Sequence, residues 1–323
     1  MSATDVLISG RVYSDLVFSG VQIPAPGAEV YADAFTISPG GAANRAVAAS
    51  RLGATTSLLS EFGDDPIGRI VEDMLRAEPD LDLAGCRRLT AHQSPISVAI
   101  TDGPERSFVT YELPATELAW HGDVPRTAHV GVGEEVPAWA RELRERGCLL
   151  FGGVGWDATG LWSDDLLTRL AGVDAIVFNE IEALSYTRAA TAEDALEVLA
   201  GHVSVVVVTL GADGAIAADG SDRVRVSAPR VTAVDPTGAG DAFTGAFMAS
   251  TAWGWSLADR TRLAVATAAC TVRGAGGARS TPTPAEVGDL LAAHDDPAWG
   301  AVRDWARHQN RSALPDSRQG TLA

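Results

Sequence analysis

The chain contains no lysine: all 25 of its basic residues are arginine, although it is 323 residues long. A Walker-type P-loop requires a lysine on the nucleotide phosphates, a PLP enzyme requires a Schiff-base lysine, and a protein-kinase site requires a strand lysine. The absence excludes all three classes. The 42 acidic residues give a formal net charge of −17. Because such a field repels phosphate backbones and no basic stripe is present, we expect no nucleic-acid partner.

Cysteines and long apolar runs are also scarce. The three cysteines (Cys86, Cys148 and Cys270) are odd in number and widely spaced, which argues against a disulfide framework or a metal cluster. The longest apolar runs, such as Val203–Leu210, are too short to span a bilayer. The N-terminus lacks the basic region and apolar core of a secretion signal. These absences predict a cytoplasmic protein with no membrane partner.

The residues that are present predict a folded α/β protein. Hydrophobic residues make up 46% of the chain and charged residues 21%, as in soluble enzymes. Repeated strand–helix alternation favours a mainly parallel sheet covered by helices on both faces. The predicted strands are Val6–Ser9, Thr55–Ser60, Cys148–Phe151, Asp174–Phe178 and Val203–Thr209, and the predicted helices are Ala43–Leu52, Leu161–Ala171, Thr191–Ala200, Asp241–Trp253 and Ser256–Arg273.

Two segments depart from this alternation and predict a separate small β-sheet. Arg11–Ile37 and Ser94–Tyr111 alternate without helical periodicity, and the second reads as a hairpin with its turn at Asp102–Pro104. A short helix is expected over Pro297–Gln309. The predicted organisation is an α/β core formed by residues 1–10, 38–93 and 112–292, a β-sheet lid formed by 11–37 and 94–111, and a C-terminal extension over 293–323.

The most informative stretch is Val234–Phe243, where a turn of small residues opens directly into a helix. Gly238 and Gly240 allow backbone N–H groups to converge, and the helix N-terminus adds about half a positive charge. Such a turn can hold a phosphoryl group without lysine. Asp241 at its mouth can accept a proton from an attacking hydroxyl. A strand-to-helix turn capped by an aspartate would look the same, so the pattern leaves both interpretations open.

The sequence Asp-Pro-Thr-Gly-Ala-Gly-Asp-Ala-Phe at 235–243 closely resembles the C-terminal signature of ribokinase-like (PfkB) sugar kinases. The resemblance implies a ribokinase-like three-layer α/β/α fold with a mainly parallel central sheet and a small β-sheet lid. It also implies that Gly238, Ala239 and Gly240 form an anion hole. Asp241 is then the catalytic base.

A second match is Pro39–Ala54, which resembles the N-terminal signature of the family. By this resemblance Gly40 and Gly41 approach the acceptor closely, the Asn44 amide bonds sugar hydroxyls, and Asp15 places a carboxylate on the sugar. Read alone, Asp15 is a turn residue and Asn44 a helix cap. The match also departs from the family pattern, because two residues rather than three separate the glycine pair from Asn44. The lysine that ribose-specific members carry in that gap is absent.

Two further motifs point to the nucleotide. Phe178–Glu182 resembles the family's N-x-x-E motif, in which Asn179 and Glu182 organise Mg²⁺ around the phosphates. A helix whose first turn carries acidic residues would show the same sequence. The sequence from Thr209 to Gly214 resembles T-L-G-x-x-G, which implies that Thr209, Gly211 and Gly214 line the nucleotide site. Gly274–Ser280 resembles the loop on the other side of the adenine.

Together the resemblance covers roughly residues 5–290 and implies transfer of the γ-phosphate of MgATP to a primary hydroxyl of a small carbohydrate such as ribose or fructose. It also implies a monovalent cation such as K⁺ held by Asp235 and the backbone of Thr237, and a homodimer formed through the lid.

Two alternatives stay open. A nucleoside or pseudouridine-type kinase would need an aromatic shelf, for which Phe108, Tyr111 or Tyr13 could serve. A non-catalytic ligand sensor on the same scaffold is the other alternative, and the intact motifs argue against it. The roles of Trp156 and Asp157 and the identity of the acceptor are not fixed by the sequence.

Overall fold

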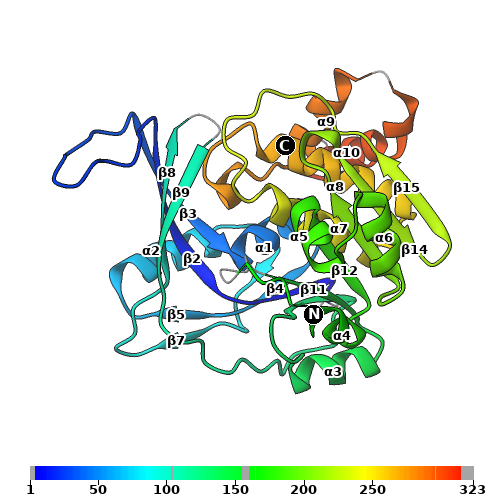
Figure 1. The fold of residues 1–323 in the computed structure, drawn as a ribbon, viewed down its shortest axis with the longest axis horizontal. Coiled ribbons are helices and arrows are strands. Elements are labelled where there is room, and N and C mark those ends of the chain that lie inside the picture. Colours follow the sequence, from blue (N-terminus) through cyan, green and yellow to red (C-terminus); the bar gives the residue numbers. More distant parts are fainter. Residues whose placement is uncertain (1–3, 103–104, 155–159, 164, 295, 314–323) are drawn as a thin grey trace, which may run out of the picture.

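The computed structural model describes residues 4–102, 105–154, 160–163, 165–294 and 296–313. Within these residues a nine-stranded sheet lies between two layers of helices, and a separate four-stranded sheet stands beside it (Figure 1). This arrangement confirms the predicted three-layer α/β/α fold with a small β-sheet. No helix of the described ranges is long and apolar enough to cross a membrane.

The large sheet has the strand order β15-β14-β13-β12-β11-β10-β1-β4-β6 and is parallel except at one edge, where β14 and β15 run antiparallel. The inner strands, from β14 to β4, are buried on both faces, as expected of a sheet covered by helices, whereas the edge strands β15 and β6 are partly exposed. They are β1 (Val6–Ser9), β4 (Thr56–Leu59), β6 (Leu81–Asp82), β10 (Thr127–Gly131), β11 (Leu149–Gly153), β12 (Ala175–Asn179), β13 (Val205–Thr209), β14 (Ala215–Asp219) and β15 (Asp222–Val226).

Each face of the sheet carries its own hydrophobic core. One face is covered by α1 (Ala42–Arg51), α2 (Pro66–Arg76), α7 (Ala239–Ala252), α8 (Leu257–Thr271), α9 (Pro284–Ala292) and α10 (Gly300–Ala313). The opposite face is covered by α3 (Ala138–Glu145), α4 (Asp165–Arg169), α5 (Glu180–Thr187) and α6 (Ala192–Ala200). The expected C-terminal helix is present as the short 3₁₀ turn η4 (Pro297–Trp299) followed by α10.

The helix predicted over Leu161–Ala171 is shorter than expected. It is formed by α4 and a 3₁₀ turn, η1 (Leu170–Gly172). Upstream, Trp162 has a left-handed backbone with φ of 50° and packs edge-on against Tyr186, with ring centroids 5.1 Å apart. A residue in this conformation cannot continue a right-handed helix, so the tertiary contact overrides the local pattern.

The small sheet has the order β3-β2-β8-β9, and its strands are β2 (Val12–Ser19), β3 (Ala34–Gly41), β8 (Ile96–Asp102) and β9 (Glu105–Tyr111). We call it the lid sheet. The β8–β9 hairpin is as predicted, although 103–104 of its expected turn lie outside the described residues. A two-stranded sheet of β5 (Glu61–Gly63) and β7 (Arg87–Leu89) lies below it (Figure 1).

Helices α1 and α7 cross closely because small residues line their contact. A Cβ atom placed on Gly245 of α7 would lie 2.4 Å from the carbonyl oxygen of Arg45 and 2.8 Å from the Cβ of Ala48 on α1. Only glycine permits this approach. Since β3 ends at Gly41 and α1 begins at Ala42, the same crossing brings the end of the lid sheet to the start of α7.

Candidate active site

The turn before α7 depends on glycine. Gly238 caps the helix in the left-handed region with φ of 75°, and a Cβ there would lie 2.7 Å from the Cα of Gly277. The first-turn amides of a helix have no carbonyl partner within their own helix, and the helix dipole adds positive potential there. A Cβ on Gly240 would meet nothing within 4 Å, so the Cα of Gly240 faces open space. The turn therefore has the form of an anion cradle.

Asp241 lies in the first turn of α7, beside this cradle, and α1 holds its carboxylate. The Asn44 amide donates to Oδ2 at 3.0 Å, and the Arg45 guanidinium forms an ion pair with Oδ1. The Asp241 side chain remains 25% exposed, so the carboxylate is oriented by the protein and still accessible. The sequence singled out Asp241 and Asn44 but gave no role to Arg45.

Asn44 joins three segments of the chain. Its Oδ1 accepts the backbone N–H of Ala278 at 2.7 Å, while its Nδ2 donates to Asp241. The side chain is 4% exposed. Its amide group lies against Gly238 and Gly277, where a Cβ would come within 3.3 and 2.7 Å of it. The amide predicted to bond the acceptor is thus already engaged with the carboxylate of Asp241 and the backbone of Ala278.

Asp15 extends from β2 over the glycine pair. A Cβ on Gly40 would lie 2.1 Å from Asp15 Oδ2, so the side chain crosses the backbone where only glycine fits. Burial raises the pKa of Asp15 to about 7, with further contributions from the negative charges of Asp241 and Asp235. Asp15 and Asp241 therefore interact electrostatically.

A polar cluster borders the acceptor side where the lid sheet meets the core. Glu112 forms an ion pair with Arg11 at 2.7 Å and accepts a hydrogen bond from the hydroxyl of Tyr13. Burial, and then this hydrogen bond, raise the pKa of Tyr13 to about 12. A Cβ on Gly41 would lie 2.7 Å from the Tyr13 ring. Tyr13 is therefore fixed by Glu112 beside the glycine pair.

On the nucleotide side, Asn179 and Glu182 form a reciprocal capping box at the start of α5. The Glu182 N–H donates to Asn179 Oδ1 at 2.8 Å, and the Asn179 N–H donates to Glu182 Oε2 at 3.0 Å. Burial raises the pKa of Glu182, and the charge of Asp241 adds to this rise. The motif thus builds the helix start, and its carboxylate interacts electrostatically with Asp241.

These residues fit a magnesium ion bound through water and phosphate. Among the described residues, no three His, Cys, Asp or Glu side chains are arranged to hold a metal directly. Magnesium commonly keeps several waters and takes only one or two protein carboxylates together with substrate phosphates. A bound cation would also favour the charged form of Glu182, whose pKa is raised first by burial and further by the charge of Asp241.

The end of β13 contributes a second turn to the nucleotide side. Thr209 is the register partner of Asn179 on β12, so the two residues end neighbouring parallel strands. Gly211 has φ of 58° and Gly214 has φ of 96°. A Cβ on Gly214 would lie 1.9 Å from the carbonyl oxygen of Val226. The T-L-G-x-x-G sequence therefore forms a turn that requires glycine at Gly214.

Asp235 fixes the loop predicted to lie on the other side of the adenine. Its Oδ1 accepts the N–H of Thr237 at 2.8 Å, and its Oδ2 accepts the N–H of Gly276 at 3.0 Å. Asp235 is 5% exposed. The carboxylate ties the turn before α7 to the segment before η3 (Gly277–Ser280).

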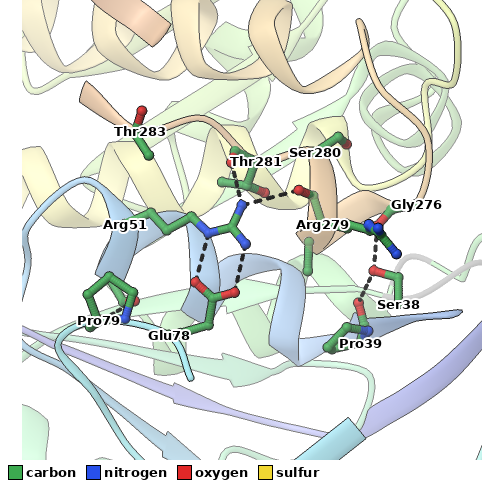
Figure 2. A network of polar contacts seen from close by, with 12 residues as sticks. Ser38, Pro39, Arg51, Glu78, Pro79, Gly276, Arg279, Ser280, Thr281 and Thr283 are labelled. Atoms are coloured by element: carbon green, nitrogen blue, oxygen red, sulfur yellow. Dashed lines mark hydrogen bonds and ion pairs between the residues drawn. The ribbon is translucent and has the colours of Figure 1, made fainter. Parts of the chain in front are cut away.

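The segment around η3 is also braced from the far end of α1 (Figure 2). Arg51 contacts both carboxylate oxygens of Glu78 at 2.7 and 2.6 Å, and it donates to the carbonyl oxygen of Thr281 at 2.6 Å. From the lid sheet, the Ser38 hydroxyl donates to the carbonyl oxygen of Gly276. One loop is therefore held by α1, by β3 and by the turn before α7. Of the remaining sequence candidates, Trp156 and Asp157 lie outside the described residues.

A glycine cradle at a helix N-terminus, an oriented carboxylate, and acidic side chains at the carboxyl ends of parallel strands define an α/β phosphotransferase that acts on a hydroxyl group. The model of the family described as pfkB family carbohydrate kinase matches residues 3–136 and 139–284. The chain therefore belongs to the pfkB family of carbohydrate kinases.

Individual relatives are distant but cover most of the chain. A ribokinase of Lactococcus lactis is 27% identical over 300 residues, which cover 88% of this chain and 96% of that protein. A nucleoside kinase of Methanothermobacter thermautotrophicus is 28% identical over 299 residues, covering 87% and 94%. The solved structure of an Arabidopsis thaliana ribokinase with ribose and ATP has a TM-score of 0.76 at 23% identity, covering 90% and 99%.

Proposed function

We propose that this protein transfers the γ-phosphate of MgATP to a primary hydroxyl of a small sugar, with Asp241 as the base. The observation that supports the proposal most directly is the Asp241 carboxylate. It is oriented by Asn44, lies beside the cradle that begins at Gly238, and interacts electrostatically with Asp15 on strand β2 of the lid sheet.

In the proposed reaction the acceptor lies between Asp15 and Asp241, and its hydroxyl proton passes to a carboxylate oxygen of Asp241. The acceptor oxygen bonds to the γ-phosphorus while the bond to the ADP oxygen breaks and ADP leaves with that electron pair. The N-terminal amides of α7 stabilise charge on the transferred group. When bound near Asn179 and Glu182, Mg²⁺ supplies positive charge to the phosphates.

The decisive variant is Asp241→Asn, which keeps the shape and removes the proton acceptor. Turnover should fall by about 10²–10⁴-fold, the range for losing a general base, with unchanged circular dichroism and thermal midpoint. Asp222→Asn, on the exposed β14–β15 hairpin, is the matched control and should keep full activity. Near-normal turnover of a verified acceptor by the Asp241→Asn protein would contradict the proposal.

A nucleoside acceptor is the second candidate, because one aromatic side chain faces the acceptor region. Phe108 pairs across the lid sheet with Ala99, which pairs with Val17, and Asp15 lies two residues before Val17 on the same face. Phe108 is 49% exposed. We would screen sugars and nucleosides by thermal shift with a nonhydrolysable ATP analogue and then assay ADP formation. If only nucleosides are turned over, the acceptor is a nucleoside and not a sugar. Binding without turnover of any compound would indicate a sensor.

A monovalent cation near Asp235 is part of the proposal. The Asp235 carboxylate is nearly buried, and both of its oxygens accept hydrogen bonds from backbone N–H groups. A cation held together with the Thr237 backbone would offset the remaining negative charge of Asp235. Replacing K⁺ by tetramethylammonium at constant ionic strength should then lower turnover several-fold. Identical rates in the two salts would remove the cation from the proposal.

We extend the proposal to a homodimer formed through the outer face of the lid sheet. Phe35 and Val109, on this face, are 53% and 67% exposed. A hollow of about 520 Å³ beside them is lined by Phe18, Tyr31 and Val98, among others. Light scattering after gel filtration should give twice the monomer mass, and Val109→Glu should halve it. A monomeric wild-type protein at tens of micromolar would contradict the dimer.

A cytoplasmic location completes the proposal. All three cysteines are unpaired, as expected in a reducing compartment where MgATP is plentiful. Fractionation of host cells with an antibody against the protein would test the location, and recovery in an extracellular fraction would contradict it.

A further inference from the structure

Arg45 makes the one ion pair of the Asp241 carboxylate within the described residues. It follows Asn44 on α1, so the two adjacent side chains engage the two oxygens of the same carboxylate, Arg45 at Oδ1 and Asn44 at Oδ2. The side chains of Arg45 and Asp241 are 22% and 25% exposed. Such a partly buried pair is screened by water much less than a surface pair.

The backbone of Arg45 lies in the α1–α7 crossing, where Gly245 of α7 approaches the Arg45 carbonyl oxygen. Arg45 Nε is buried, and no residue of the described ranges bonds it. Asp241 is therefore the partner that fixes the guanidinium.

Two further carboxylates interact electrostatically with Asp241. The pKa values of Asp15 on β2 and of Glu182 at the start of α5 are raised first by burial and in part by the charge of Asp241. Burial also holds the pKa of His129 on β10 well below its usual value, and the charge of Arg45 lowers it further. Within the described residues, Arg45 is therefore the basic side chain that an ion pair joins to this acidic group.

We propose that Arg45 is a positioning residue that holds the Asp241 carboxylate at Oδ1, so that a free lone pair of the carboxylate faces the acceptor hydroxyl. The inference rests on the proposed function. When the hydroxyl proton reaches Asp241, the ion pair is lost and the guanidinium charge stands beside the phosphoryl group. Because arginine stays charged at every working pH, the arrangement needs no lysine.

The test compares Arg45→Gln and Arg45→Lys with wild type in kcat and in the KM of the acceptor. Arg45→Gln should lower kcat by about tenfold or more and leave KM within about twofold, because the carboxylate is no longer held at Oδ1. Arg45→Lys should restore part of the rate, because an ammonium keeps the charge but lacks the planar fork of a guanidinium.

Arg223→Gln is the matched control. Arg223 contacts both carboxylate oxygens of Glu197 at 2.6 and 2.9 Å on the surface, so its loss removes an arginine pair without touching the site. Its kcat and KM should match wild type. A wild-type kcat in Arg45→Gln would overturn the inference while leaving the kinase assignment intact.

A measurement without turnover separates the two hypotheses. In crystal structures, the Asp241 carboxylate should leave its wild-type orientation in Arg45→Gln and keep it in Arg45→Lys. An unchanged carboxylate in all three proteins would reject the role of Arg45, whether or not an acceptor is found. If Arg45→Gln does not fold, Arg45→Met replaces it.

Discussion

The acceptor side and the nucleotide side of this site are built in different ways. On the nucleotide side, Asn179 and Glu182 cap each other within one helical turn, and Gly211 and Gly214 shape one short turn. On the acceptor side, Asp241 is held by a residue 196 positions away in the sequence. Local contacts form with their own segment, whereas distant contacts form only when the helices dock. The orientation of Asp241 therefore depends on the docking of α1 against α7, whereas the Asn179–Glu182 cap does not. The η3 loop shares this dependence through its contacts with α1 and β3.

The largest effect is expected from breaking a local turn on the nucleotide side. Gly214→Ala should cost about 3–4 kcal/mol, because its backbone region is nearly exclusive to glycine and the new Cβ would meet the carbonyl oxygen of Val226. Gly211→Ala is the matched control: a Cβ there meets nothing within 4 Å, so the cost should be about 1–2 kcal/mol of left-handed strain. Urea unfolding measures both. An equal loss of unfolding free energy in the two variants would show that the contact with Val226 does not restrict position 214.

A smaller effect is expected from Arg51, which links helix α1 to the η3 loop. Arg51→Gln removes two contacts with Glu78 and the bond to the carbonyl oxygen of Thr281, and should cost about 1–3 kcal/mol. Its affinity for a nonhydrolysable ATP analogue should fall as the η3 loop loosens. Arg223→Gln, whose partner Glu197 is 60% exposed, should lower the stability far less, because water screens an exposed ion pair. Titration calorimetry measures the affinity for the ATP analogue. An unchanged affinity in Arg51→Gln would show that Arg51 stabilises only its own surroundings.

The smallest effect concerns Asp15 and depends on pH. Its pKa is about 7 in the folded protein against a usual 3.8, so the folded state keeps a proton that the unfolded chain releases near pH 4. Stability from this group is complete at low pH and declines as pH rises toward about 7. Asp15→Asn should therefore be more stable than wild type by on the order of 1 kcal/mol at pH 8 and little different at pH 4. Thermal midpoints of the two proteins at pH 4 and pH 8 provide the check. A higher midpoint of Asp15→Asn at pH 4 alone would contradict the predicted direction of the pH dependence.

The same contrast explains what could be predicted from the sequence. Strands β1, β4, β11, β12 and β13, the lid hairpin and the glycine turns follow from local patterns and were predicted. Strand β10 and the antiparallel strands β14 and β15 were not predicted. The ion pair of Arg45 with Asp241 was not, because it depends on the α1–α7 crossing at Gly245, which no local pattern reveals. For the same reason the partners of Asn44 were not foreseen. What each of these residues binds stays a prediction.

The direct passage from β3 into α1 has a mechanical consequence. No loop separates the lid strand from the helix: Gly41 ends the strand, with φ of 61° at the cap, and Ala42 begins the helix. A displacement of β3 would therefore act directly on the helix that carries Asn44 and Arg45, the two partners of the Asp241 carboxylate.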